Sequence, residues 1–292
     1  MVFSAPSLQA KLKEREPLSR HSTFRVGGIA DYAISVDSIP LMQEVCRFAA
    51  DHELRVRVVG KGSNILFDDA GFRGLVIFNA ITFCQHEGES LYVGGGHSFA
   101  RLGAKLSAKG WSGLEFASGI PGSVGGAVYM NAGANGSNVS RVVTHVESVT
   151  RSGTHCVQRR EELDFSYRTS PFQASKSIVV AARFRLTRSD TAREQQRAFL
   201  AKRTASQPYS LPSAGCIFRN PDGASAGFLI ESCGLKGMRI GGAEVSDLHA
   251  NFIVNRGGAT SRDILTLIDH IKHRVAEKTG HILTLEVEYL PA

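Results

Sequence analysis

The stretch SGIPGSVGGA, from Ser118 to Ala127, holds four glycines and one proline within ten residues. Backbone N–H groups in such a stretch can approach a phosphate closely, because glycine has no Cβ and accepts positive φ. Two other glycine-rich stretches precede it, Gly60-Lys-Gly-Ser-Asn64 and Gly94-Gly-Gly96. None of them fits a Walker loop or the G-x-G-x-x-G of a dinucleotide-binding βαβ unit. Either each is an ordinary tight turn, or successive loops wrap one long anionic ligand such as a dinucleotide.

The chain has 292 residues, of which 42% are hydrophobic and 21% charged, and its formal net charge is +7. At this length single hydrophobic cores begin to divide, so two or three packed units are expected. No apolar run approaches a membrane span and no signal segment is evident, so we expect a cytoplasmic protein without membrane insertion. The positive charges are scattered and lack interleaved aromatic residues, so we expect no nucleic acid partner, although a basic nucleic-acid-binding protein is the competing class.

The cysteines are odd in number, widely spaced and without a C-x-x-C pair, which indicates neither a disulfide framework nor a zinc knuckle. They are Cys46, Cys84, Cys156, Cys216 and Cys233. His270 and His273 are spaced for one helix face, but that helix is charged, so we expect both to face solvent. The sequence therefore predicts reduced thiols and no metal.

Hydrophobic periodicity indicates short strands in the first part of the chain and longer helices in the last part. Helices are expected from Ser38 onward and at 98–110, 190–208 and 261–279. Strands are expected at 54–60, 75–78, 91–93, 142–150, 178–186 and 282–290. This change of pattern places a domain boundary between residues 189 and 190.

Three motifs resemble the flavin domain of the UDP-N-acetylenolpyruvoylglucosamine reductase family. They are Ser22-Thr-Phe-Arg-Val-Gly-Gly28, Val59-Gly-Lys-Gly-Ser-Asn-Ile-Leu66, and Gly119 to Ala127 with Met130-Asn-Ala-Gly133 after it. The resemblance continues in order through Ser166-Tyr-Arg-Thr-Ser-Pro-Phe172, Ser213 to Pro221, Gly241 to Ser246 and Leu285-Glu-Val287. It covers nearly the whole chain and is similar to the smaller variant of the family, which lacks an inserted tyrosine-bearing substrate loop.

The resemblance implies an α+β fold. Residues 1–189 would form an FAD-binding domain of the vanillyl-alcohol-oxidase (PCMH) type, in two lobes that divide near residues 60–80. Residues 190–292 would form a C-terminal α+β substrate-binding domain. For the cofactor, the matching stretches imply contacts from Arg25, Gly60, Lys61, Gly62, Ser63, Asn64, Ser118, Gly119, Pro121, Gly122, Ser123, Gly125, Gly126 and Asn131.

The resemblance also implies a reaction. With NADPH as cosubstrate and FAD bound, UDP-N-acetyl-3-O-(1-carboxyvinyl)-glucosamine would be reduced to UDP-N-acetylmuramate, an oxidoreductase step of peptidoglycan precursor and cell wall synthesis. The partners would be the UDP-sugar and NADPH, and a monomer is expected. An alternative keeps the fold and changes the reaction to that of another FAD-dependent alcohol oxidase or dehydrogenase.

Such a reduction places hydride on a CH₂ carbon and leaves negative charge beside the substrate carboxylate. The resemblance assigns Arg168 to this charge, because a guanidinium stays charged and pairs with a carboxylate through two hydrogen bonds. It assigns Glu286, rather than the neighbouring Glu288, to polarising the carboxylate or relaying a proton. Cys216 stands where serine is commoner in the family, and we expect it to donate the proton, because a free thiol with a pKa of about 8.5 stays protonated.

Substrate binding needs cations for the diphosphate and polar groups for the hydroxyls and the base. The segments that match the family supply these groups, although the alignment of single side chains is open. The expected contacts are Tyr167, Lys202, Arg203, Asn220, His249 and Asn251.

Overall fold

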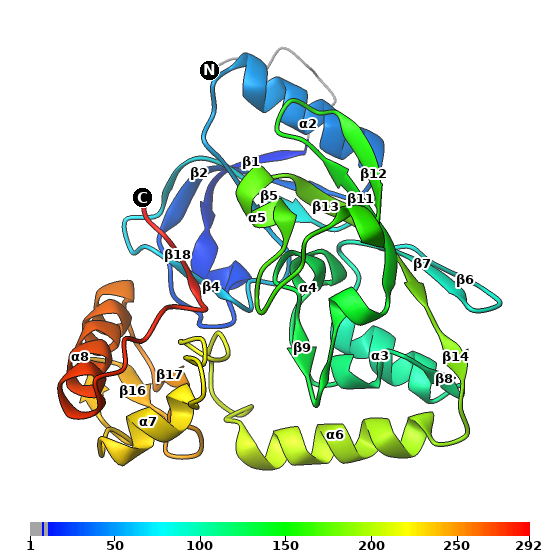
Figure 1. Cartoon of the computed structure of the whole chain (residues 1–292). Coiled ribbons are helices and arrows are strands. Elements are labelled where there is room, and N and C mark those ends of the chain that lie inside the picture. The colour runs from blue at the N-terminus through cyan, green and yellow to red at the C-terminus, as the bar shows by residue number, and fades with distance from the viewer. Residues whose placement is uncertain (1–7, 9–10) are drawn as a thin grey trace. The chain divides into compact units, whose positions relative to one another are not determined.

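The computed structural model describes Leu8 and residues 11–292 (Figure 1). The chain packs into two compact units, each assembled from segments that are far apart in the sequence. Unit 1 comprises Met1–Glu14, Tyr32–Lys61 and Gly74–Lys202, and unit 2 comprises Arg15–Asp31, Gly62–Arg73 and Arg203–Ala292. The domain boundary expected between residues 189 and 190 remains a prediction, since the compact units follow a different division.

One sheet has four strands in the order β1-β2-β5-β3, with β3 and β5 parallel. Its strands are β1 (Leu12–Pro17), β2 (Ile29–Val36), β5 (Phe72–Asn79) and β3 (Val56–Val59). Helix α2 (Ile39–Asp51) begins where the sequence predicts, because the side chain of Ser38 accepts a hydrogen bond from the N–H of Leu41 at 3.4 Å. Its buried side chains join those of β5 in one apolar cluster.

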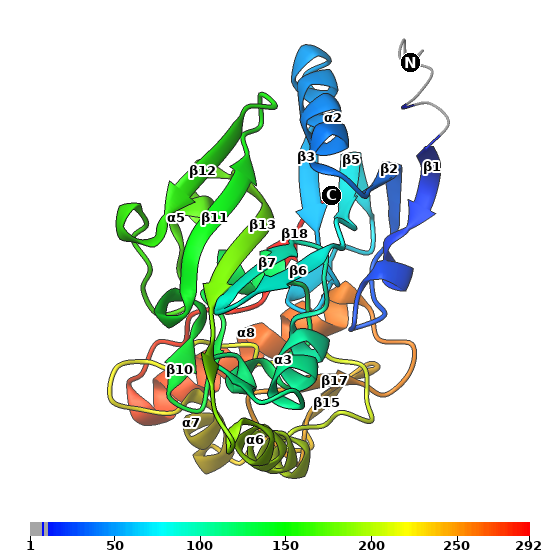
Figure 2. The ribbon, with the colours of Figure 1, turned by 90° about the vertical axis from the view of Figure 1, so that its right-hand side faces the viewer.

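A second sheet has five antiparallel strands in the order β12-β11-β13-β7-β6 (Figure 2). They are β12 (His155–Arg159), β11 (Val143–Val149), β13 (Ile178–Arg185), β7 (Ser90–Gly94) and β6 (Cys84–Glu87). Helices α3 (Phe99–Ser107) and α4 (Val124–Tyr129) contribute to the core that this sheet buries. The helix expected at 98–110 is confirmed, with Ser98 as its N-cap and a turn after Ser107.

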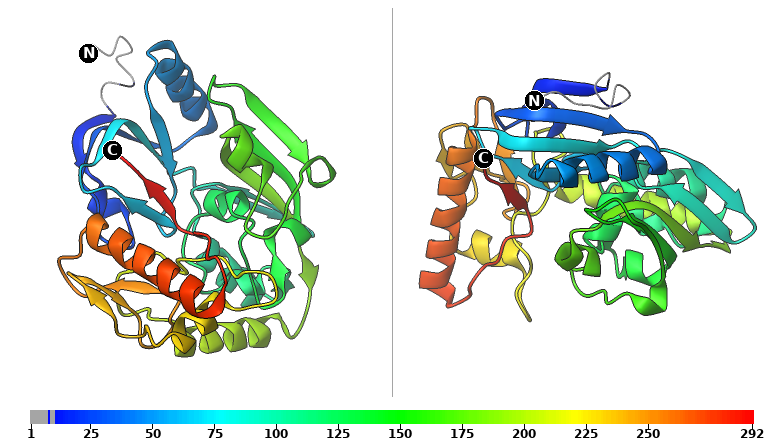
Figure 3. Two further views of the ribbon diagram at one scale, coloured as in Figure 1. Left: turned by 60° about the vertical axis from the view of Figure 1, so that its left-hand side comes forward. Right: turned by 90° about the horizontal axis from the view of Figure 1, so that it is seen from above.

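Unit 2 contains a three-stranded antiparallel sheet in the order β15-β16-β17, which α8 covers (Figure 3). The strands are β15 (Arg239–Ile240), β16 (Ala243–Val245) and β17 (Ile253–Asn255). Helix α8 (Ser261–Thr279) has the predicted bounds, because Thr260 and Asp263 form a capping box and Gly280 ends the helix with φ 72°. Helix α7 (Ala226–Ser232) packs against the same apolar cluster.

The remaining long helix, α6 (Ala192–Ser206), is polar on most of its surface and confirms the helix expected at 190–208. Short elements complete the described chain. They are β4 (Ile65–Phe67), β8 (Trp111–Ser112), β9 (Gly133–Ala134), β10 (Ser137–Asn138), β14 (Thr187–Arg188), α5 (Pro171–Ser175), β18 (Glu288–Leu290) and the 3₁₀ turns η1 (Leu18–His21), η2 (Glu115–Ala117), η3 (Val139–Arg141) and η4 (Arg160–Glu162).

The strand predicted at 282–290 is wrong over most of its length. Only Glu288–Leu290 forms a strand, parallel to β4, and Leu285 makes an isolated bridge with Phe218. The N–H groups of Glu286 and Val287 both donate to the carbonyl of Ile217, at 2.8 and 3.4 Å. Two successive donors on one acceptor interrupt a regular ladder, as in a bulge, which the alternation of side chains does not reveal.

The carboxylate of Glu244 lies on β16 with 1% of the residue exposed and holds two arginines of unit 2. The Nε of Arg256 donates to one carboxylate oxygen at 2.8 Å, and the Nε of Arg239 donates to the other. The guanidinium of Arg256, followed by that of Arg239, holds the pKa of Glu244 below its usual value of 4.5 against the opposing effect of burial.

We predict that Glu244→Gln lowers the free energy of unfolding at pH 7 by about 2 kcal/mol, because charge-assisted bonds to partly exposed arginines are lost. A lowered pKa stabilises the fold above 4.5, and this contribution disappears as the pH falls through the folded-state pKa. The difference between variant and wild type should therefore shrink in urea unfolding at pH 3. Glu277→Gln, which removes an exposed pair with Arg274, is the control and should change little. Equal losses at both pH values would contradict the assignment.

Candidate functional site

Two predicted cofactor loops lie against each other in unit 1. Ser123 caps α4 by accepting a hydrogen bond from the N–H of Gly126 at 3.2 Å. A Cβ placed on Gly60 would lie 2.1 Å from the Oγ of Ser123. The loop that follows β3 therefore approaches the start of α4 this closely because residue 60 is a glycine.

The third glycine stretch supports the loop at 118–126 from the turn that follows β7. The N–H of Gly125 donates to the carbonyl of Gly95 at 2.7 Å, and the N–H of Val124 donates to that of His97 at 2.9 Å. A Cβ on Gly95 would lie 2.6 Å from the carbonyl oxygen of Val179 on β13. Gly94-Gly-Gly96 therefore has a packing role. The sequence alone could not distinguish this role from ligand binding.

Ser118 is buried, with 2% of its surface exposed, and its Oγ has no hydrogen-bond partner among the described residues. A buried hydroxyl without a partner is costly unless a ligand or water completes it. Gly119 and Gly122 beside it have φ of 79° and 127°, which only glycine adopts without strain. This combination of an unpartnered hydroxyl and glycine backbone fits a polar, phosphate-bearing cofactor such as FAD.

The turn that carries Tyr167 and Arg168 also belongs to unit 1. Ser166 and Thr169 exchange two backbone hydrogen bonds of 3.1 Å, and Arg168 between them has φ 55°. An arginine held in this left-handed region costs on the order of 1 kcal/mol, so the surroundings must impose it. Its guanidinium lies 5.3 Å from the centre of the ring of Tyr167, a residue that is 52% exposed.

Asn131, predicted as a cofactor contact, connects this turn to the end of α4. Its Nδ2 donates to the carbonyl of Ser166 at 2.9 Å, and its Oδ1 accepts from the N–H of Ser140 at 3.0 Å. Both ends of its side chain thus bond to protein groups. The structure gives Asn131 a role in holding the turn, while its contact with a cofactor stays a prediction.

In unit 2 the predicted Arg25 segment lies against Gly62. The N–H and the hydroxyl of Thr23 both donate to the carbonyl of Gly62 at 3.1 Å. Gly62 has φ 64°, and a Cβ there would lie 1.9 Å from the carbonyl oxygen of His21. Arg25 has φ 57°, so its backbone is also left-handed. These contacts join the two cofactor motifs of unit 2 through the backbone N–H and the hydroxyl of Thr23.

The Cys216 segment runs between two other segments of unit 2. Cys216 forms an isolated bridge with Phe252, and the N–H of Ile217 donates to the carbonyl of Asn251 at 2.8 Å. On the other side, the carbonyl of Ile217 accepts from the N–H of Glu286 at 2.8 Å. The structure therefore brings the backbones of Cys216, Asn251 and Glu286 together, although 70 residues separate Cys216 from Glu286 in the sequence.

Asn251, a residue that is 3% exposed, holds this arrangement with its side chain. Its Oδ1 accepts from the N–H of Phe218 at 2.9 Å, and its Nδ2 donates to the carbonyl of Phe218 at 2.8 Å. The side chain of Asn64 similarly donates to the carbonyl of Glu286 at 3.0 Å. Asn251 and Asn64 thus have structural contacts, and their predicted ligand contacts remain predictions.

His249 lies beside this cluster, with its ring 4.9 Å from that of Phe252. Burial, together with the positive charges of Lys236 and Arg203, lowers the pKa of His249, which favours the neutral ring at pH 7. Its Nδ1 accepts from the N–H of Asn251 at 3.3 Å. A neutral ring bonded in this way suits a hydrogen-bonding contact better than a charge contact.

The predicted residues are divided between the units. Unit 1 contains Gly60, Lys61, Ser118, Gly119, Pro121, Gly122, Ser123, Gly125, Gly126, Asn131, Tyr167, Arg168 and Lys202. Unit 2 contains Arg25, Gly62, Ser63, Asn64, Arg203, Cys216, Asn220, His249, Asn251 and Glu286.

Two of the predicted substrate contacts in unit 2 also form hydrogen bonds within the protein. The side chain of Asn220 accepts a hydrogen bond from the N–H of Ala226 at the start of α7, and the guanidinium of Arg203 donates to the hydroxyl of Tyr209.

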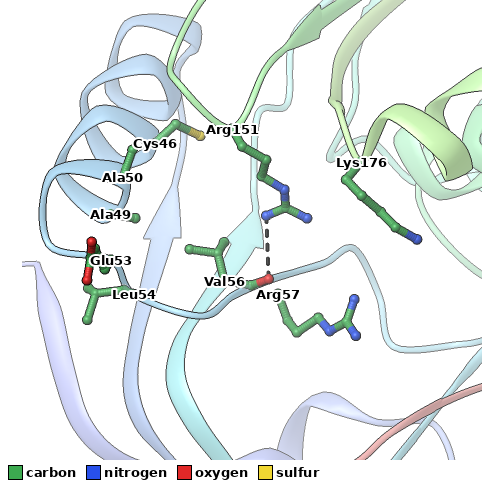
Figure 4. A pocket seen from close by; sticks show the side chains of 9 residues that line it. All are labelled: Cys46, Ala49, Ala50, Glu53, Leu54, Val56, Arg57, Arg151 and Lys176. Carbon is green, nitrogen blue, oxygen red and sulfur yellow. Dashed lines mark hydrogen bonds between the residues drawn. The ribbon is translucent and has the colours of Figure 1, made fainter.

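A separate pocket of roughly 430 Å³ lies in unit 1 (Figure 4). Its lining residues are Cys46, Ala49, Ala50, Glu53, Leu54, Val56, Arg57, Arg151 and Lys176. Burial raises the pKa of the Cys46 thiol to about 11, and Arg151 donates to the carbonyl of Val56 at 3.5 Å. None of the predicted site residues lines this pocket, so it lies outside the candidate site.

Two other properties of the described chain bear on the site. No helix among residues 11–292 is long and apolar enough to cross a bilayer. In the same part of the chain, no group of three histidine, cysteine or acidic side chains is arranged to hold a metal ion. No disulfide links the cysteines in the described part of the chain.

Sequence reasoning missed Gln173, whose carboxamide bonds to the carbonyls of both Tyr129 and Arg168. A glutamine two residues after a proline gives no local signal for such a role. Only the return of the chain to the end of α4 reveals it.

Comparison with known proteins covers both parts of the chain. A family model described as the C-terminal domain of UDP-N-acetylenolpyruvoylglucosamine reductase matches residues 207–290, and one described as an FAD binding domain matches residues 30–157. The chain is 49% identical to the UDP-N-acetylenolpyruvoylglucosamine reductase of Protochlamydia amoebophila, over 94% of this chain and 92% of that protein. It is 46% identical to that of Chlamydia trachomatis serovar A, over 98% of each. The crystal structure of UDP-N-acetylenolpyruvylglucosamine reductase from Thermus caldophilus superposes with a TM-score of 0.81 at 36% identity, covering 96% of this chain and 100% of that one.

We predict that Gly62→Ala destabilises unit 2 and lowers flavin content, because the new Cβ would collide with the carbonyl of His21. Gly280→Ala is the matched control, since Gly280 has a similar φ of 72° and no atom within 4 Å of a Cβ. The control should cost about 1 kcal/mol from backbone strain alone. Gly62→Ala should cost clearly more in urea unfolding, and equal losses would show that the close approach to His21 is unimportant.

Proposed function

The chain belongs to the UDP-N-acetylenolpyruvoylglucosamine reductase family, and on this basis we propose that it reduces UDP-N-acetyl-3-O-(1-carboxyvinyl)-glucosamine to UDP-N-acetylmuramate with NADPH as reductant. It is a flavoprotein oxidoreductase of α+β fold whose cofactor is FAD. The structural observation that best supports this proposal is that the Cys216 segment lies between the Asn251 and Glu286 segments and is hydrogen-bonded to both. The reaction belongs to peptidoglycan precursor synthesis, and we place it in the cytoplasm with a monomeric enzyme.

Bound FAD would supply the hydride that it receives from NADPH. In unit 1, the backbone of Gly60 and the loop from Ser118 to Gly126 would hold it, and the hydroxyl of Ser118 would gain the partner that it lacks. In unit 2, Arg25 and the backbone from Gly62 to Asn64 are the proposed contacts. These residues would position the cofactor.

Arg168 would stabilise the negative charge that develops beside the substrate carboxylate. An arginine side chain supplies a permanent positive charge, and the turn from Ser166 to Thr169 holds the backbone of Arg168 in one conformation. A charge fixed before the reaction needs no reorganisation as the anion forms, and losing one such donor costs about 3 to 4 kcal/mol of activation energy. Tyr167, whose ring lies beside the guanidinium, would contact the substrate from the same turn.

Cys216 would give its thiol proton to the carbon next to the carboxylate, forming the new C–H bond and leaving a thiolate that solvent reprotonates. The structure supports this role by placing Glu286, rather than Glu288, beside the Cys216 segment. The N–H of Glu286 bonds to the carbonyl of Ile217, whereas the N–H of Glu288 bonds to that of Asn64. Glu286 would then polarise the carboxylate or relay the proton.

Four polar residues complete the proposed grip on the substrate. The cations Lys202 and Arg203 would contact the diphosphate, while Asn220 and the neutral ring of His249 would bond hydroxyls or the base. His249 suits this role because its pKa is lowered by burial and by nearby cations. Asn251 would contribute mainly by holding the backbone of Phe218.

The central test is enzymatic. The purified protein should be yellow with the absorbance of oxidised flavin, and it should consume NADPH in proportion to added UDP-linked enolpyruvyl sugar. Addition of the unmodified UDP-N-acetylglucosamine is the control and should not stimulate NADPH oxidation. Turnover of an alcohol with oxygen, without any dependence on the enolpyruvyl sugar, would overturn the proposed reaction.

The proposed role of Cys216 as proton donor can be tested separately. Cys216→Ser should keep activity within about tenfold, because a hydroxyl also donates a proton, whereas Cys216→Ala should lose at least about a hundredfold in kcat. Cys156→Ala, at a free cysteine on β12, is the control and should behave as wild type. A serine variant that retains flavin but is as inactive as the alanine variant would point to covalent catalysis by sulfur.

A further inference from the structure

The turn around Arg168 needs support from outside itself, because its conformation is strained. Arg168 has φ 55°, and its own turn contributes the two backbone bonds between Ser166 and Thr169 and a bond from the hydroxyl of Thr169 to the carbonyl of Tyr167. The carbonyl of Arg168 points away from that ladder and accepts a hydrogen bond from the Nε2 of Gln173 at 3.0 Å. The bond fixes the peptide plane that follows the arginine, and with it the direction of the backbone from which the guanidinium extends.

The same amide nitrogen of Gln173 reaches the last residue of α4. It donates to the carbonyl of Tyr129 at 2.9 Å and contacts the sulfur of Met130 at 3.6 Å. A primary amide nitrogen carries two hydrogens, so two carbonyl acceptors satisfy it completely. Gln173 therefore joins the Arg168 turn to α4 with both of its donors.

Two neighbouring side chains strengthen this junction. The hydroxyl of Ser170, which is buried, donates to the same carbonyl of Tyr129 at 2.7 Å. Asn131 donates to the carbonyl of Ser166 at 2.9 Å. Ser123 in the predicted cofactor loop is the N-cap of α4, and Tyr129 is the last residue of this helix, so these bonds tie the Arg168 turn to the far end of α4.

We propose that Gln173 is a positioning residue, which sets the place of the Arg168 guanidinium relative to the cofactor loop at 118–126. The inference rests on the proposed function of Arg168. The inference adds that the carboxamide of Gln173 acts on the substrate-reducing half of the reaction through its bond to the carbonyl of Arg168. Flavin reduction by NADPH does not need the carboxylate-binding cation and should be largely independent of it.

The two most informative substitutions keep the size of the side chain. Gln173→Glu places carboxylate oxygens against the carbonyls of Arg168 and Tyr129, which replaces two attractions by repulsion. Gln173→Met removes the donors without adding charge. The control is Gln85→Glu, which introduces the same charge at an exposed residue of β6 in the same unit.

The experiment measures the two half-reactions separately by anaerobic stopped flow on the flavin-loaded enzyme. For Gln173→Glu and Gln173→Met we expect a tenfold to hundredfold slower oxidation of the reduced enzyme by the enolpyruvyl sugar, and less than a twofold change in its reduction by NADPH. Flavin content and Tm, measured on the same samples, show that the variants are folded. Equal slowing of both half-reactions, or no slowing of either, would overturn the inference.

The pH profile adds an observation that a purely structural role would not change. The substrate-reducing rate of Gln173→Glu, relative to wild type, should rise as the pH falls, because a protonated carboxyl loses its repulsive charge and regains one donor. The rate of Gln173→Met, relative to wild type, should be independent of pH. Parallel profiles for both variants would count against the proposal.

A double variant separates this inference from the proposed function. If Gln173 acts through Arg168, then Arg168→Ala combined with Gln173→Glu should be no slower than Arg168→Ala alone. Losses that multiply would show that Gln173 acts independently of Arg168 and would refute the inference. If Arg168→Ala itself leaves the substrate-reducing step unchanged, the proposed role of Arg168 fails first.

Discussion

The two hydrogen bonds between the side chain of Asn251 and the backbone of Phe218 are the constraint on which the candidate site in unit 2 depends. At 2.9 and 2.8 Å they satisfy a buried donor and a buried acceptor that no regular ladder reaches. They hold the Cys216 segment so that Ile217 can pair with Asn251 on one side and with Glu286 on the other. Because a buried amide unable to make these bonds is costly, the arrangement is narrowly specified.

Unit 1 achieves a comparable effect through one short helix. Its start is held at the cofactor loop by Ser123, and its end is held at the arginine turn by Ser170, Gln173 and Asn131. The helix has only six residues, so side-chain bonds at its two ends replace the length that would otherwise stabilise it. One rigid element thereby relates a cofactor loop to a cation proposed to act on the substrate.

Local signals in the sequence were sufficient for much of the fold. The bounds of α8 follow from Thr260, Asp263 and Gly280, which act within one helical turn of each end. The start of α2 follows in the same way from Ser38. The terminal strand was mispredicted because its hydrogen bonding depends on Ile217, about 70 residues earlier in the chain. The carbonyl of Ile217 accepts two successive N–H donors, which interrupts the strand. Alternation of side chains carries no information about such a distant acceptor.

The sequence by itself determined the family, the kind of cofactor and the residues expected to act. It could do so because glycine loops and the ordered motifs consist of residues that are neighbours in the chain. Only the tertiary structure decided which of those residues serve the backbone. The side-chain amides of Asn251, Asn131 and Asn64 form hydrogen bonds with backbone groups of distant segments. The bond from Gln173 to the carbonyl of Arg168 was not indicated by any sequence motif. The physical reason is that a hydrogen bond is specified by position in space, and folding sets those positions through contacts between segments that the sequence keeps apart.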